Sequence, residues 1–259
     1  MKNQQMPRYA HVIAESVERD RSLCSLRDHA PDIIYYLRFS EIEKDYEEKA
    51  AVIWQEIRNL YPVAHTEEYE VSWNEFDRTF LVILEIMAKE KAQGNIVIPH
   101  IFSGSHISAM AMHAASCLIG QSLEYFRAEK YFPIKSGVRP DTRVVLPPLP
   151  MVLPDHRSCV MLKFLLDYTK SHKDSPWQGR RADLAIDMRS QWTRYRNPSK
   201  LPKPDSFLTF TTNTLKYCVD KGYILREDIK AGRMKLTLTA SGQLLAKAWE
   251  ILSRYRLES

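Results

Sequence analysis

One short turn in this chain has the residue types of an anion-binding site. In the stretch HIFSGSHISAM, Ser103, Gly104 and Ser105 follow an apolar run and lead directly into a segment with helical spacing. N–H groups at a helix N-terminus attract phosphate, glycine allows close backbone approach or positive φ, and serine can donate to an anion or cap the helix. The turn therefore fits either a phosphate site or an ordinary cap. It is not the dinucleotide fingerprint, because the sequence contains no G-x-G-x-x-G.

A second group of residues suits contact with nucleic acid. The segment SFLTFTTNTLKYCVDKG predicts a helix that begins after Ser206 as N-cap and ends at Gly222. Leu208, Leu215 and Val219 share one predicted side. The side roughly opposite carries polar and cationic groups that suit base edges and phosphates: Thr209, Asn213, Lys216 and Tyr217.

Cations also flank this predicted helix. The hairpin expected after it, YILRED-IKAG-RMKLTLT, brings three cations near its turn: Lys230, Arg233 and Lys235. The loop before it adds four more: Arg194, Arg196, Lys200 and Lys203. The alternative is that the helix and hairpin serve dimerisation or protein contact. DNA binding is favoured, because the excess of positive charge falls on the same helix and hairpin.

Other chemistry has little support in the sequence. His106 and His113 share a helix face, but no carboxylate nearby completes a metal-ligand set and no HExxH occurs. The stretches RSLCSL and HAASCL contain no nucleophile-elbow pattern, and the carboxylates of HTEEYEVS fit the solvated edge of a sheet. The four cysteines are expected to be small buried residues. No catalytic residue, metal or cofactor is expected.

The net charge of +5 is unevenly distributed. Residues 1–132 carry 14 Lys and Arg against 20 Asp and Glu, whereas residues 155–259 carry 20 against 11. An acidic front and a basic back predict two modules with different partners, and a basic module of this size is typical of nucleic-acid binding. The sequence has no run of 18 apolar residues and no apolar stretch at its start, so a cytoplasmic protein is expected.

The front of the chain alternates strand and helix patterns. Strands are predicted at AHVIAE, DIIYYLRF, VAHTEEYEVS, NIVIPHIF and SLEYFRAEKYF, with helices between them at residues 19–29, 41–60, 72–94 and 105–119. Ser72 and Glu75 form a capping-box pattern, and Gly94 is a suitable helix end. This alternation predicts an α/β domain over residues 1–132, with a parallel Rossmann-like sheet covered by helices on both faces.

The back of the chain has a different pattern. Residues 133–154 contain six prolines and predict an extended linker, in which RVVL could form a short strand. Residues 155–259 then give three predicted helices, a hairpin and a final helix. That order predicts a winged helix-turn-helix domain.

The front domain resembles a known family. HIFSGSHISAMAMHAAS looks like the glycine motif of the CRISPR-associated Rossmann-fold (CARF) domain, in which a strand ends in a Ser/Thr-Gly-Ser/Thr-Lys turn before a helix. Six positions match: Ser103, Gly104, Ser105, Ile107, Ala109 and Ala111. His106 stands where Lys is usual, and His100 and Phe102 stand where Asn and Ser are common.

Two further stretches carry the same resemblance. HVIAESVERDRSL is similar to the first CARF strand and its turn: Glu18, Asp20 and Arg21 match, and Ser16 stands where Gly is usual. EYFRAEKYF is similar to the strand that follows the glycine motif. The order of the two domains is similar to that of archaeal CARF regulators with a C-terminal winged helix.

The resemblance implies that a cyclic oligoadenylate or related nucleotide binds across a homodimer of CARF domains. Its phosphates would meet the turns after the first and fourth strands, at Ser16, Arg21, Ser103, Gly104, Ser105 and His106. The expected function is a ligand-responsive transcription regulator that binds promoter DNA. Two alternatives stay open: a CARF-type nuclease that cleaves cyclic oligoadenylate, and a scaffold that binds protein through its winged helix.

Overall fold

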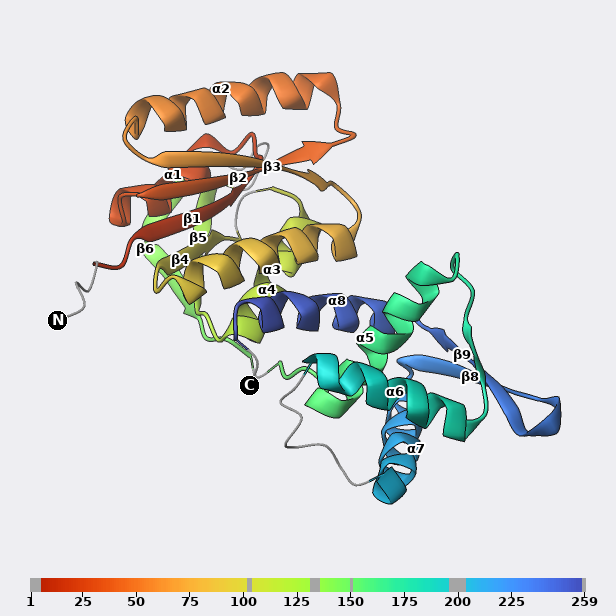
Figure 1. The fold of residues 1–259 in the computed structure, drawn as a ribbon. Helices are drawn as coiled ribbons and strands as arrows, with labels where there is room; N and C mark the ends of the chain where they lie inside the picture. The colour runs from red at the N-terminus through yellow and green to blue at the C-terminus, as the bar shows by residue number, and fades with distance from the viewer. Residues whose placement is uncertain (1–5, 102–103, 131–135, 150, 196–203, 258–259) are drawn as a thin grey trace. The chain divides into compact units, whose positions relative to one another are not determined.

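The computed structural model describes residues 6–257 apart from 102–103, 131–135, 150 and 196–203. The chain divides into two compact units (Figure 1). The first comprises residues 1–152 together with 251–259, and the second comprises residues 153–250. No helix in the described part of the chain is long and apolar enough to cross a membrane.

The first unit alternates strands and helices, as the sequence predicts. Its strands are β1 (Tyr9–Ala14), β2 (Ile33–Ser40), β3 (His65–Ser72), β4 (Ile96–His100), β5 (Leu123–Lys130) and β6 (Ser136–Leu146). Its helices are α1 (Arg19–Asp28), α2 (Lys44–Leu60), α3 (Phe76–Ala92) and α4 (His106–Ile119). Gly94 (φ +81°) ends α3 as predicted: its N–H donates to the Lys91 carbonyl, and the Asn95 N–H donates to the Glu90 carbonyl.

The six strands form one sheet in the order β3-β2-β1-β4-β5-β6. β3, β2, β1 and β4 are parallel, and β5 pairs parallel with β4 through His100 and Glu124. β6 runs antiparallel to β5. The parallel strands therefore have a Rossmann-like order, and the order reverses between β1 and β4, which is where ligands bind in open α/β sheets.

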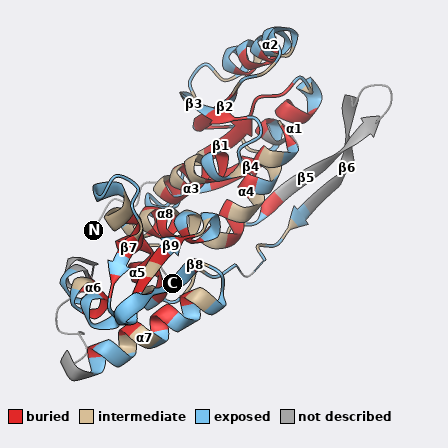
Figure 2. Ribbon diagram, turned by 90° about the vertical axis from the view of Figure 1, so that its right-hand side faces the viewer, coloured by how far each residue is buried: buried red, intermediate tan, exposed pale blue. Residues whose placement is uncertain are grey.

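Helices cover both faces of this sheet, and its central strands are largely buried (Figure 2). Ile13 of β1 and Ile34 of β2 form one buried cluster with Leu23 and Leu26 of α1 and Ile57 of α2. α3 packs against α4, β3 and β4, and α4 also packs against β4. Along β2, five successive residues from Ile33 to Leu37 are buried, so both faces of that strand are covered.

The proline-rich segment is more than a linker. β6 occupies residues 136–146 within it and pairs with β5, so part of the segment predicted as a linker belongs to the sheet. β6 is the last strand of the sheet. Proline is tolerated on edge strands, so a proline-rich composition does not exclude pairing there.

The second unit contains α5 (His156–Ser171), β7 (Trp177–Gly179), α6 (Arg181–Tyr195), α7 (Pro204–Asp220), β8 (Ile224–Ile229), the short 3₁₀ turn η2 (Lys230–Gly232), β9 (Arg233–Leu238) and most of α8 (Ala240–Arg254). The three strands form an antiparallel sheet in the order β7-β9-β8. Its core joins α5, α6, α7 and the sheet through large side chains that include Phe164, Trp177, Trp192, Phe207 and Leu236.

Three details of the second unit differ from expectation. α7 begins at Pro204, ahead of the predicted N-cap Ser206, because proline is favourable in the first turn of a helix. Leu208 is 44% exposed, although helical spacing places it on the same side of the helix as the buried Leu215. Phe207, Leu215 and Cys218 occupy the buried side instead. The short strand β7 was not predicted, because three residues are too few to show a period.

Candidate functional site

The turns after β1 and β4 meet at the reversal point of the sheet. Gly104 has φ +82°, and a Cβ built on it would lie 2.5 Å from Ala14 Cβ at the end of β1 and 2.8 Å from Ser108 Oγ in α4. Both distances are shorter than any real side chain tolerates, so the chain needs glycine here. Packing inside the unit therefore requires glycine at position 104 whether or not a nucleotide approaches this turn.

Ser105 forms the N-cap of α4. Its Oγ accepts from the Ser108 N–H at 3.1 Å, and Ser108 Oγ donates to the Ser105 carbonyl at 2.8 Å. Ser105 is buried, whereas His106, the first helical residue, is exposed. The Ser105 hydroxyl is therefore already engaged as the helix cap. The side chain exposed at the start of this helix is that of His106. Ser103 lies outside the described residues.

The turn after β1 is closed by its own polar contacts. The Glu18 N–H donates to Ser16 Oγ at 3.0 Å, and the Arg21 guanidinium forms an ion pair with the Glu18 carboxylate. The Arg21 side chain is only 7% exposed. Glu18 thus neutralises the cation that was expected to meet a phosphate, and an anion would have to compete with this carboxylate.

Glu15 was not predicted as part of this region. It follows β1 directly, is 2% exposed, and accepts from the Phe39 N–H at 2.8 Å through Oε2. Burial raises the pKa of this carboxyl, although the Phe39 N–H opposes the shift. Among the described side chains of the two turns, carboxylates outnumber cations, so backbone N–H groups at the start of α4 would have to supply most of the attraction for an anion.

A buried histidine pair lies beside this region. His11 of β1 and His100 of β4 are fully buried, and His11 Nδ1 lies 2.9 Å from His100 Nε2. Burial lowers the pKa of His11 to about 4 and the pKa of His100 well below its usual value. The charge of the nearby His29 contributes to this lowering of the His11 pKa, whereas a backbone hydrogen bond with His29 and the charge of Asp32 oppose it. The pair is neutral at pH 7, and sequence spacing could not show it because the two residues are 89 positions apart.

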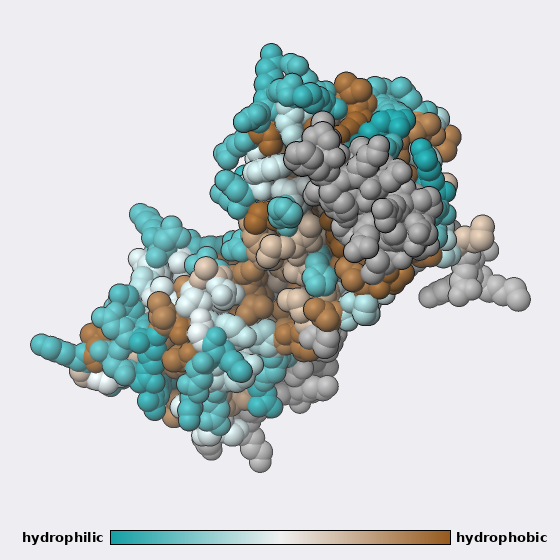
Figure 3. Space-filling view, turned by 180° about the vertical axis from the view of Figure 1, so that it is seen from behind, coloured by the Kyte–Doolittle hydropathy of each residue, from teal (hydrophilic) through white to brown (hydrophobic). Residues whose placement is uncertain are grey.

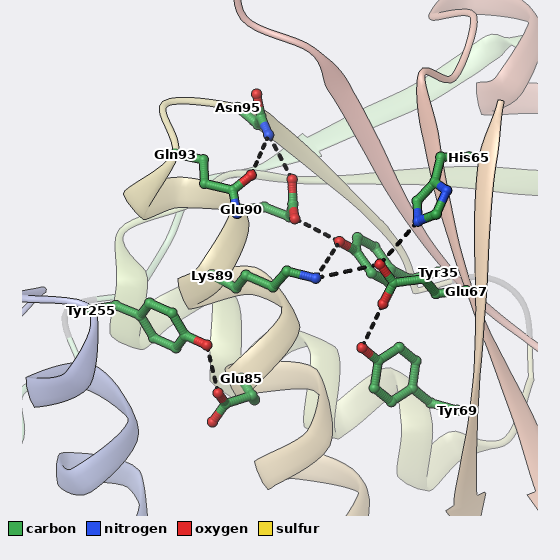
Figure 4. A network of polar contacts seen from close by, with 10 residues as sticks. All are labelled: Tyr35, His65, Glu67, Tyr69, Glu85, Lys89, Glu90, Gln93, Asn95 and Tyr255. Atoms are coloured by element: carbon green, nitrogen blue, oxygen red, sulfur yellow. Dashed lines mark hydrogen bonds and ion pairs between the residues drawn. The ribbon is translucent and has the colours of Figure 1, made fainter.

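A second polar network joins β2, β3 and α3 (Figure 4). Glu90 is 1% exposed; it accepts from Tyr35 Oη at 2.5 Å and from Asn95 Nδ2 at 2.6 Å. Lys89 Nζ lies 3.4 Å from the Glu67 carboxylate, which also accepts from Tyr69. The edge carboxylate Glu67 is therefore paired rather than simply solvated. The described residues contain no group of His, Cys, Asp and Glu that could hold a metal.

In the second unit, α7 exposes a polar surface. Thr209, Asn213, Lys216 and Tyr217 are all exposed, as their predicted side of the helix requires. Tyr217 is 40% exposed, and Lys221 Nζ lies 5.9 Å from its ring centroid. Donors and acceptors of these kinds can read base edges, and the two lysines can meet phosphates.

The hairpin β8–β9 is cationic but partly self-paired. Lys230 and Arg233 are exposed at its turn, whereas Lys235 Nζ lies 3.0 Å from Glu227 Oε2. Figure 3 shows mostly hydrophilic residues over the hairpin end of this unit. Residues 153–250 carry 18 Lys and Arg against 10 Asp and Glu. Of the four cations predicted in the loop before α7, Arg196, Lys200 and Lys203 lie outside the described residues, and the side chain of Arg194 is not described.

No family model and no curated protein sequence matches the chain. Among solved structures, the chain is similar to Can2 from Sulfobacillus thermosulfidooxidans, solved in complex with cyclic tetra-adenylate. The TM-score is 0.39 at 11% identity, over 93% of this chain and 64% of that one. It is also similar to Enterococcus italicus Csm6 bound to cyclic hexa-2′-fluoro-hexa-dAMP, with a TM-score of 0.41 at 13% identity, over 83% of this chain and 53% of that one. This chain spans less than two thirds of the length of each. At these low scores neither likeness decides its family or ligand.

Proposed function

We propose that this protein is a DNA-binding transcription regulator whose first unit senses a nucleotide. The observation that carries the proposal is the exposed polar side of α7, beside a cationic hairpin in a unit with a large excess of Lys and Arg. The order α5, β7, α6, α7, β8, β9 supports the proposal, because it resembles the order of elements in a winged helix-turn-helix domain. In this arrangement α7 would be the recognition helix in the major groove, and the hairpin would be the wing.

The nucleotide part of the proposal rests on the reversal point of the first unit and on the CARF-like motifs of the sequence. The turn at Gly104 leads into α4 at the carboxyl end of β4, where an anion would meet the helix N-terminus. We propose a cyclic oligoadenylate or related nucleotide, bound across a homodimer of first units. In this site His106 would face a phosphate. Arg21 could also bind a phosphate, but only if its ion pair with Glu18 broke.

DNA retention over a salt series tests the regulator. Full-length protein is titrated with a promoter duplex and a random duplex, and the logarithm of the binding constant is plotted against the logarithm of salt concentration. A linear decrease indicates counterion release from phosphates. If the protein binds neither duplex at low salt, the positive charge serves solubility or protein contact, and the regulator proposal fails.

Calorimetry tests the sensor. Titration with cyclic tetra- and hexa-adenylate should release or absorb heat and change the affinity for the promoter duplex, because a ligand that binds two states unequally shifts their equilibrium. Chromatography of the same mixtures separates sensing from the nuclease alternative: intact ligand supports a sensor, and linear products support a nuclease. No heat with either ligand would leave Ser105 as a helix cap and nothing more.

A further inference from the structure

The second unit contains a pocket with an unusual concentration of arginine. Its volume is about 410 Å³, within the range of small-ligand sites. Four guanidinium groups and one carboxylate are the charged groups among its described lining residues. These are Arg180, Arg181, Arg226, Arg233 and Asp228.

Strand pairing explains why these residues meet. Gly179, the last residue of β7, pairs with Met234 of β9, so Arg180 and Arg181 follow immediately beside the start of β9. Ile229 at the end of β8 pairs with Arg233, and Arg226 pairs with Leu236. The Arg180 N–H donates to Asp183 Oδ2 at 2.7 Å, which fixes the entry into α6.

The charges of the pocket are not balanced within it. Asp228 Oδ1 accepts from Arg226 at 2.9 Å from Nε and 2.6 Å from Nη2. Among the described residues, no carboxylate lies within ion-pair distance of Arg180, Arg181 or Arg233. These three guanidinium groups therefore lack an ion-pair partner of their own among the described residues, so they repel one another, and a bound anion would relieve that repulsion.

We propose that this pocket is a phosphate-binding site in which Asp228 occupies the place of the ligand at Arg226. Guanidinium groups bind phosphate oxygens through paired, charge-assisted hydrogen bonds. Asp228 is 69% exposed, so it can turn away when an anion arrives. The phosphate is either a phosphodiester of the DNA backbone, which rests on the proposed function, or a phosphate group of a free ligand.

Two variants and one control test the site in the full-length protein. Arg180→Ala/Arg181→Ala removes two exposed cations, and Asp228→Asn removes the competing carboxylate. Arg189→Ala is the control, because it removes an exposed arginine of α6 that does not line the pocket. Inorganic pyrophosphate is the probe, and its effect on the melting temperature is measured alongside the salt dependence of binding to a random duplex.

We expect pyrophosphate to raise the melting temperature of the wild type and of Arg189→Ala, to raise that of Asp228→Asn more, and to have little effect on the double variant. If the DNA backbone is the source of the phosphate, the magnitude of the slope of log K against log salt also falls by about two in the double variant. An unchanged slope with a lost pyrophosphate response identifies a free ligand.

Failure of the site and failure of the regulator are distinguishable. If pyrophosphate stabilises the wild type but the wild type binds no duplex, the phosphate site stands and the proposed DNA-binding function fails. Equal pyrophosphate responses and equal salt slopes in the wild type and the double variant overturn the phosphate site.

Discussion

Gly104, two residues before α4, lies directly against Ala14, the last residue of β1. A Cβ at position 104 would be 2.5 Å from the Cβ of Ala14. This close approach leaves no room for a side chain at position 104, so packing against β1 constrains the backbone just before α4.

Gly104→Ala should therefore destabilise the first unit. Its φ of +82° is strained for alanine and its Cβ collides with β1, so a loss of roughly 2–4 kcal/mol is expected. Gly94→Ala is the matched control, because Gly94 has φ +81° but no atom within 4 Å of the added Cβ. Chemical denaturation of both variants separates the cost of the positive φ from the cost of the collision with Ala14. An equal loss of stability in both variants would show that the contact with Ala14 has no steric effect.

Ser105→Ala should cost about 1 kcal/mol, because the Ser108 N–H loses its cap. Ser105→Asn should restore most of that stability, since asparagine also caps helices well. If the hydroxyl does more than cap, the Asn variant will keep wild-type stability but bind cyclic oligoadenylate more weakly in calorimetry. Matching stability together with matching affinity would assign Ser105 to the cap alone.

The protein should lose stability in mild acid. His11 has a pKa of about 4 in the folded state, below its usual 6.5, so between these values the unfolded chain binds more protons. At about 1.4 kcal/mol per pKa unit, this group predicts a loss of roughly 3 kcal/mol between pH 7 and pH 4. The buried His100 acts in the same direction.

Denaturant unfolding at a series of pH values measures this loss. His11→Asn should flatten the profile between pH 6.5 and pH 4, although it lowers stability at neutral pH. The exposed His172 provides the control variant His172→Asn. A His11→Asn profile as steep as that of the control would assign the acid sensitivity to other groups.

DNA contacts of two kinds should be separable in the second unit. Asn213→Ala on the exposed side of α7 should cost about 1–3 kcal/mol at one base pair and relax the preference there. Arg233→Ala in the hairpin should weaken all sequences about equally and reduce the salt slope by about one. Lys216→Ala, one helical turn from Asn213, tests whether its ammonium reads a base or a phosphate.

The control for this series is Lys170→Ala, an exposed lysine at the end of α5. It should change neither base preference nor salt slope. If Lys170→Ala reduces the salt slope as much as Arg233→Ala does, the slope reports the overall charge of the protein and the hairpin makes no specific contact with DNA phosphates.

The sequence alone determined the order of elements in the first unit. Apolar strands alternating with amphipathic helices fix a parallel sheet, because each element must bury its apolar side. Local signals also placed the helix end at Gly94 and the exposed side of α7, since both depend on residues within one or two turns of the helix.

Only the tertiary structure decided which charges remain available for a ligand. Arg21 pairs with Glu18, the His11 and His100 rings meet across two strands, and Arg180 comes beside Arg233 through strand pairing. Leu208 faces out because the core of its unit is filled by Phe207 instead. These outcomes depend on contacts between distant residues, on burial and on competition between neighbours for one partner, none of which a local spacing pattern records.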